Sequence, residues 1–177
     1  MKNNKKKSNN WVIKAFFLTL VISSLFSLLA NSVLPIAPIW LSCFLILIFV
    51  LIGVVADAIA TAVTIATPAQ FNSMASRQVH GGKTTIYLIH NADRVANICG
   101  DIIGDICSII SGGAIAILID TLTNSRLPVY ALMIILSAFV SALTVGLKAA
   151  GKAIAIKNAN SITYQVALFI CIFRGEK

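Results

Sequence analysis

Four long apolar stretches, each close to the length of a bilayer crossing, constrain what this chain can fold into. They cover residues 11–33, 40–67, 97–122 and 127–148. A helix needs about 20 apolar residues to cross the hydrocarbon core of a membrane. With 58% hydrophobic and 11% charged residues, the composition excludes an ordinary soluble domain, which is about half apolar and about a quarter charged. We therefore predict an all-α fold: a polytopic membrane helix bundle of about four apolar helices.

The segments outside these spans are more polar. Residues 1–10 are predicted to form a basic polar tail, and residues 11–177 a single transmembrane domain. Segments 68–96 and 149–173 mix polar and apolar residues, which is typical of amphipathic helices at the inner face of a membrane. We expect these segments to add interfacial helices to the bundle.

The positive charges predict the orientation of the chain. The net charge is +8, and its lysines and arginines gather in residues 1–14, 77–94 and 148–177. Because basic residues flank the cytoplasmic ends of membrane helices, this pattern predicts both termini on the cytoplasmic side of the cell membrane. The expected partner is therefore the lipid bilayer, and binding to nucleic acid is not expected.

Charged groups within or at the ends of the apolar stretches are the strongest pointers to function. They are Asp57, Asp101, Asp105 and Lys148. A charge at the bilayer centre costs about 2.5–3.5 kcal/mol on insertion scales. Such residues normally face a bundle interior, a partner or a water-filled path.

Polar residues at helical spacing continue this pattern. One face of the third span is expected to carry Asn97, Asp101, Asp105 and Ser108, and one face of the fourth Ser141, Thr144 and Lys148. Stripes of this kind predict a bundle with a hydrophilic centre. Hard cations such as Mg²⁺ prefer oxygen ligands, often one or two carboxylates with retained waters. The candidate metal ligands are Asp57, Asp101, Asp105, Asn97 and Ser108, and the candidate pathway residues or charge partners are Ser141, Thr144 and Lys148.

Two carboxylates one helical turn apart repel each other, and three arrangements would relieve that cost. One carboxyl group is protonated, Lys148 neutralises the pair, or a bound cation does so. Small residues beside the stripes predict close helix packing; they are Gly100, Gly104, Gly112, Ala142 and Gly146.

The stretch Asn91-Ala-Asp-Arg-Val-Ala-Asn-Ile-Cys-Gly-Asp-Ile-Ile-Gly-Asp-Ile resembles part of the CorB/CorC (cyclin-M) magnesium-transporter family. Asp57-Ala-Ile-Ala-Thr-Ala-Val is similar to the family's small-rich second helix. Gly100-Asp101 or Gly104-Asp105 falls near its Gly-Asn-Asn helix, and residues 147–158 on its Gly-Glu-x-x-Pro-Lys segment. Lys148 stands where the family has glutamate, and Gly151 where it has proline.

The resemblance implies a transmembrane domain that forms homodimers and moves divalent cations, with Mg²⁺ as the bound or transported ion. Full-length family members add CBS domains, which are not expected here. The leading hypothesis is thus a divalent-cation transporter or a divergent remnant of one. The alternative is a non-transporting membrane interaction or scaffold protein with a structural Asp–Lys pair. No covalent cofactor and no enzymatic activity are expected, because HExxH, GxSxG and phosphate-loop motifs are absent from the sequence.

Overall fold

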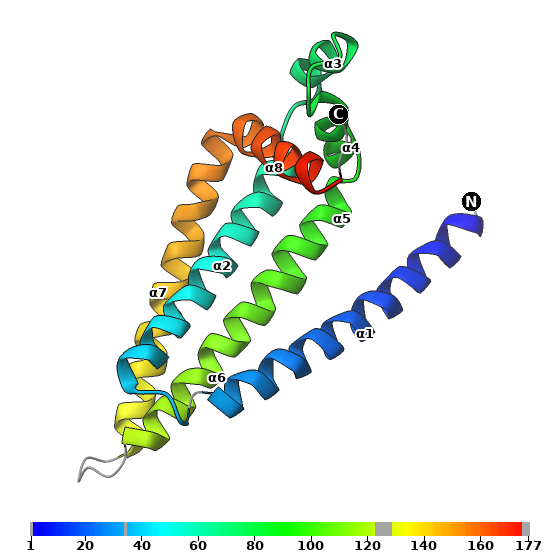
Figure 1. The fold of residues 1–177 in the computed structure, drawn as a ribbon. Helices are drawn as coiled ribbons and strands as arrows, with labels where there is room; N and C mark the ends of the chain where they lie inside the picture. The colour runs from blue at the N-terminus through cyan, green and yellow to red at the C-terminus, as the bar shows by residue number, and fades with distance from the viewer. Residues whose placement is uncertain (1, 34, 123–128, 175–177) are drawn as a thin grey trace. The chain divides into compact units, whose positions relative to one another are not determined.

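The computed structural model describes residues 2–33, 35–122 and 129–174, and within these ranges the chain is helical and contains no strand. Side chains 2–12, 14, 118–122, 129–130, 132 and 173–174 lie outside the description. The helices are α1 (Lys2–Val33), α2 (Ile39–Ile65), α3 (Pro68–Ser76), α4 (Gly82–His90), α5 (Ala92–Ala96), the π-helix η1 (Asn97–Gly104), α6 (Asp105–Leu122), α7 (Val129–Lys157) and α8 (Ala159–Arg174) (Figure 1). The predicted all-α fold class is confirmed.

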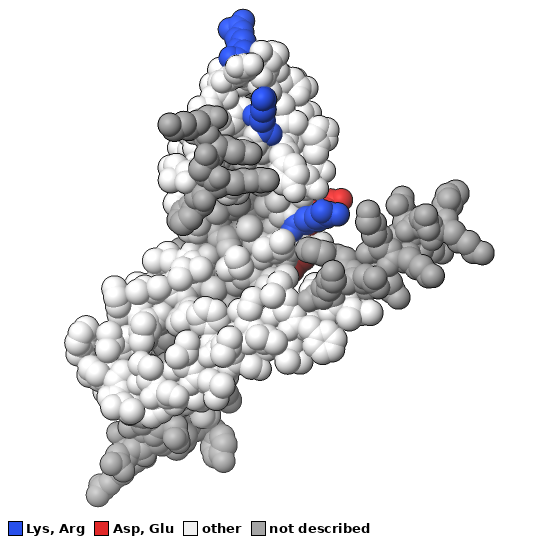
Figure 2. Space-filling view, turned by 45° about the vertical axis from the view of Figure 1, so that its right-hand side comes forward, with Lys and Arg blue, Asp and Glu red and all other residues white. Residues whose placement is uncertain are grey.

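Among the residues that the structure describes, four helical segments are long and apolar enough to cross a membrane. They are Ala15–Val33, Ile39–Ile65, Ala92–Ile117 and Met133–Lys157. Most of the face shown in Figure 2 carries neither acidic nor basic side chains, as expected of a surface in contact with lipid. The chain is a membrane protein by these criteria, while the type of membrane and the side of each terminus stay predictions.

Several helix boundaries differ from the predicted ones. Helix α1 begins at Lys2, so the backbone of residues 2–10 is helical and continuous with the first span, which covers Ala15–Val33. Helix α7 continues past Lys148 to Lys157, because the alanines and lysines of this stretch favour helix. The third span begins at Ala92, before the predicted Asn97. The first residue of the predicted fourth span, residue 127, lies outside the described residues.

The chain packs as two compact units, each with its own core. The first unit comprises Met1–Val50 and Ile106–Ser141. Its buried centre is formed by Ile46, Ala114 and Ile115. Phe26 and Phe49 add an edge-to-face ring contact with centroids 6.2 Å apart. This unit is held by apolar contacts of the kind that membrane helices use.

The second unit comprises Leu51–Asp105 and Ala142–Lys177. Its core is built largely of small side chains, with Ala62, Ala155 and Ala159 buried together. Small residues let membrane helices approach closely, and α2 and α7 do so here. A Cβ atom added to Gly151 would lie 2.9 Å from Val54 Cγ1. The register between α2 and α7 is therefore set by this close contact.

Short helices close one end of the second unit. Val63, Leu88 and Ala167 form a buried cluster that joins α2, α4 and α8, and Figure 1 shows α8 beside α4. The side chain of Asn160 accepts a hydrogen bond from the Thr67 backbone N–H (3.0 Å). The predicted interfacial segment 68–96 corresponds to α3, α4 and α5. Segment 149–173 corresponds to the last turns of α7 and to α8.

Candidate charged site in the transmembrane helices

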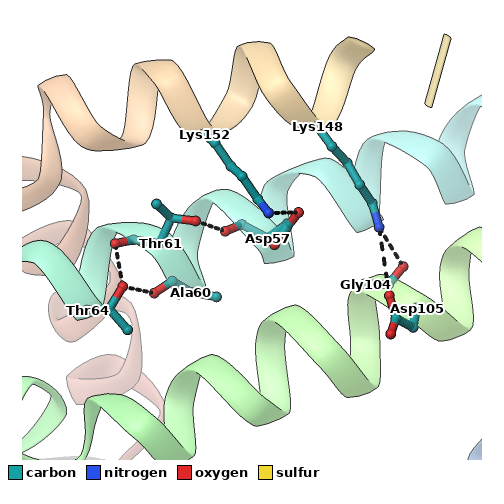
Figure 3. Close-up of polar contacts among 8 residues, drawn as sticks. All are labelled: Asp57, Ala60, Thr61, Thr64, Gly104, Asp105, Lys148 and Lys152. Carbon is teal, nitrogen blue, oxygen red and sulfur yellow. Dashed lines mark hydrogen bonds and ion pairs between the residues drawn. The ribbon is translucent and has the colours of Figure 1, made fainter. Parts of the chain in front are cut away.

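An ion pair of the second unit joins α7 to α2. Lys152 Nζ lies 3.1 Å from Asp57 Oδ2 (Figure 3). The Asp57 side chain is 15% exposed and that of Lys152 is 48% exposed, so the carboxylate is largely shielded while the lysine reaches outward. An ammonium and a carboxylate in hydrogen-bond contact form a strong, charge-assisted interaction. Asp57 is therefore neutralised within its own unit.

Sequence reasoning singled out Asp57 but did not pair it with Lys152. The signal that could have found the pair is the spacing of Lys148 and Lys152, which lie four residues apart and hence on one helix face. Both lysines point from α7 toward the neighbouring helices in Figure 3. Lys148 was predicted as a charge partner of the aspartates, but the lysine that pairs with Asp57 is Lys152.

Lys148 contacts the third span more loosely. Its Nζ donates a hydrogen bond to the backbone carbonyl of Gly104 (3.4 Å) and lies 4.0 Å from Asp105 Oδ1. The Lys148 side chain is 20% exposed and that of Asp105 is 70% exposed. An exposed pair at this distance contributes little to stability. Asp105 is thus only weakly engaged by Lys148.

Asp101 is not part of either pair. Its side chain is exposed, and among the described residues it makes no hydrogen bond or ion pair. Nor do the described residues bring together three His, Cys, Asp or Glu side chains that could hold a metal. The predicted ligand set of Asp57, Asp101 and Asp105 is consequently not assembled: Asp57 faces α7, while Asp101 and Asp105 are exposed.

The π-helical segment η1 places the glycines and the polar residues of the third span on different faces of the helix. In a π-helix each N–H bonds to the carbonyl five residues back, so a turn is wider than in an α-helix. Gly100 and Gly104 are buried, whereas Asn97, Asp101 and Asp105 are exposed. The glycines repeat every four residues, and so do the polar residues. In a helix with wider turns, residues four apart stay on one face, so the glycines and the polar residues occupy separate faces of η1. The polar stripe therefore lies on the exposed side of η1 and not in a hydrophilic centre.

The buried glycines allow η1 to approach α2 and the ion pairs. A Cβ atom added to Gly100 would lie 3.2 Å from Ala60 Cβ and 3.7 Å from Asp57 Oδ1. One added to Gly104 would lie 3.8 Å from the Gly53 carbonyl oxygen and 3.9 Å from Lys148 Nζ. The predicted packing role holds at these two positions.

The remaining predicted residues divide between the two units. Ser108 and Ser141 belong to the first unit. Thr144 is buried within the second unit, with 9% of its surface exposed. A Cβ atom added to Gly112 or Gly146 would meet nothing within 4 Å, and Ala142 is exposed. A packing role for these last three positions stays a prediction about contacts outside the chain.

Asp57 and Lys148 lie inside the candidate spans Ile39–Ile65 and Met133–Lys157, away from the helix ends. At a rise of about 1.5 Å per residue, Asp57 is about 12 Å from the end of α2 and Lys148 about 14 Å from the end of α7. Pairing of the lysines with the carboxylates lowers the cost of placing these charges in the membrane.

Comparison with known proteins returned no relatives. No protein-family model, no curated protein and no solved structure matches the chain. The likeness to the CorB/CorC family therefore rests on the residues quoted above, and the account of function rests on geometry.

Proposed function

We propose that this chain is a non-transporting membrane interaction protein, in which Asp57 serves a structural pair and the exposed acidic face of the third span contacts a partner. That acidic face consists of Asn97, Asp101 and Asp105. The observation that carries the proposal is the exposure of Asp101 and Asp105 on a membrane helix. An ionised residue at membrane depth is satisfied by a partner or by water.

The chemistry of the acidic face identifies the kind of partner. Two carboxylates and an amide are matched by a transmembrane helix that carries lysine or arginine near the same membrane surface. A two-fold contact centred on the acidic face would instead oppose carboxylates from the two copies, since both copies present the same patch in such a dimer. The expected homodimer would accordingly use another surface.

The second candidate function is cation binding by Asp101 and Asp105. Their exposure and their spacing of four residues favour it, because Mg²⁺ is often held by one or two carboxylates with retained waters. In this candidate the ion would be hydrated and held at the surface of the third span. Asp57 would remain with Lys152 and would not act as a ligand.

Photo-crosslinking in native membranes tests the proposal. A p-benzoylphenylalanine at Ile98, which is 39% exposed beside the acidic face, should give a discrete adduct with another membrane protein. Asp101→Asn with Asp105→Asn should abolish that adduct. The matched control places the crosslinker at Ile154, 60% exposed on α7, where the double substitution should change nothing.

Two crosslinking results would contradict the proposal. If Ile98 gives no discrete adduct, or if the adduct persists in the Asp101→Asn, Asp105→Asn variant, the acidic face is not the docking surface. The yield of folded protein in the same membranes shows that the variant is present and stable.

A further inference from the structure

A cavity lies at the turn between α3 and α4, against α8 and apart from the ion pairs. Its volume is about 520 Å³, within the range of pockets that hold small ligands. The residues that line it are Gln78, Val79, His80, Gly81, Lys83, Thr84 and Cys171. Most of these offer a polar side chain, so the cavity suits a polar ligand better than an acyl chain.

The wall of the cavity is held firmly in place. Gly81 has φ +82°, and a Cβ atom there would lie 2.9 Å from Leu168 Cδ2. The Tyr164 hydroxyl donates a hydrogen bond to the His80 carbonyl (3.1 Å). The Cys171 thiol contacts the buried Thr84 hydroxyl at 3.1 Å. The cavity is therefore formed before any ligand binds, which lowers the entropic cost of binding.

The exposed side chains at the cavity include a cation and two hydrogen-bonding groups. Lys83 and His80 are both exposed, and the Gln78 amide adds a hydrogen-bond donor. Among described residues 66–96 and 149–172, the acidic side chain is Asp93 alone, and the basic ones are Arg77, Lys83, Arg94, Lys152 and Lys157. The surroundings of the cavity are thus complementary to an anion.

The position of the cavity relates it to the membrane surface. One candidate span ends at Ile65 and the next begins at Ala92, so the chain between them returns to the same side of the membrane. Helix α8, which packs on α4 through the buried contact of Leu88 with Ala167, belongs to that side as well. A cavity in this layer lies at the level where phospholipid headgroups are found.

From the cavity, its charge and its level, we infer that the α3–α4 turn binds the phosphate group of an anionic phospholipid. Lys83 supplies the charge, while His80 and Gln78 supply hydrogen bonds to phosphate oxygens. Basic pockets at the cytoplasmic ends of membrane helices are suited to such headgroups. Free phosphate shares this chemistry, and the experiment separates the two sources. The inference does not depend on the acidic face of the third span.

Thermal unfolding in lipid nanodiscs at fixed ionic strength tests it. The wild-type protein should unfold at a higher temperature in discs containing phosphatidylglycerol than in discs of phosphatidylcholine alone. Lys83→Gln with His80→Gln should remove most of that gain. Lys157→Gln, which removes a charge on exposed α7 outside the cavity, should retain it. All variants should unfold at similar temperatures in phosphatidylcholine, because the substituted side chains are exposed.

If phosphatidylglycerol raised the unfolding temperature of the Lys83→Gln, His80→Gln variant as much as that of the wild type, the inference would be overturned. The lipid would then act through general charge attraction and not through the cavity. In a second experiment, inorganic phosphate is added to the protein in phosphatidylcholine discs. The unfolding temperature is expected to stay the same. A shift as large as that from phosphatidylglycerol would assign the cavity to a soluble phosphate and overturn the lipid assignment.

Discussion

Lys152 and Asp57 form a 3.1 Å ion pair between α7 and α2, and this contact gives the more buried of the two paired carboxylates a counter-charge within the chain. The ammonium group of Lys152 neutralises the Asp57 carboxylate, as a bound cation would. Unlike a bound cation it cannot dissociate, because it belongs to a helix that packs against α2 through Ala155 and Ala62. The role of the acidic residues divides accordingly: Asp57 serves the fold, and Asp101 with Asp105 face outward.

Breaking this pair should destabilise the protein. Asp57→Asn or Lys152→Gln leaves one partner without its counter-charge, and losing one partner of a fully buried pair costs about 3–5 kcal/mol. Since Lys152 is about half exposed, we expect a smaller loss, about 1–2 kcal/mol for either substitution. Equilibrium unfolding in detergent measures both single variants and the double variant.

The double variant decides whether the loss comes from the pair. A coupling free energy of at least about 0.5 kcal/mol is expected for two residues in contact. Strictly additive losses would mean that each side chain acts through other contacts and that the pair is incidental.

The second pair should matter less than the first. Asp105 is 70% exposed and lies 4.0 Å from Lys148, and exposed pairs contribute about 0–1 kcal/mol. Asp105→Asn should therefore cost clearly less than Asp57→Asn in the same unfolding assay. A larger loss for Asp105→Asn would indicate that this carboxylate is covered by a contact outside the described chain.

Two glycines of α7 should respond in opposite directions to alanine. At Gly151 the new Cβ atom would meet Val54 Cγ1 at 2.9 Å, and valine is stiff about its first side-chain torsion. Overpacking of this kind costs about 1–3 kcal/mol. At Gly146 the Cβ atom meets nothing within 4 Å, so alanine should gain up to about 1 kcal/mol of helix propensity.

Thermal unfolding of the two variants in the same detergent compares them directly. The wild type should lie between Gly146→Ala and Gly151→Ala. If both variants unfold at the same temperature, α2 and α7 do not approach each other closely at Gly151. A loss at Gly146 alone would instead place a partner helix over that position.

The sequence predicted the membrane class and the number of spans because apolar length is a local property. The four apolar stretches correspond to the four candidate spans. The spacing of Lys148 and Lys152 puts both on one face of α7, but which of the two lysines meets Asp57 depends on the register of α2 against α7. That register is set by contacts such as Gly151 with Val54, which no single stretch of sequence contains.

The predicted metal site stays a prediction, although Asp57, Asp101 and Asp105 are not brought together among the described residues. Asn97, Asp101 and Asp105 do share one face, as their spacing of four predicts. Spacing alone does not say whether a polar face turns inward or outward. The buried Gly100 and Gly104 decide it, since they let η1 lie against α2 with the polar stripe on the opposite side. The π-helical turn itself has no dependable signature in the sequence.

The most direct test of the account is thermal unfolding of the purified protein in detergent with Mg²⁺ titrated at constant ionic strength. If the buried carboxylate is neutralised by Lys152 and the acidic face serves a protein partner, the unfolding temperature should not change across the titration. Saturable stabilisation by Mg²⁺ that disappears in the Asp101→Asn, Asp105→Asn variant would contradict the account. It would assign the acidic face to a cation.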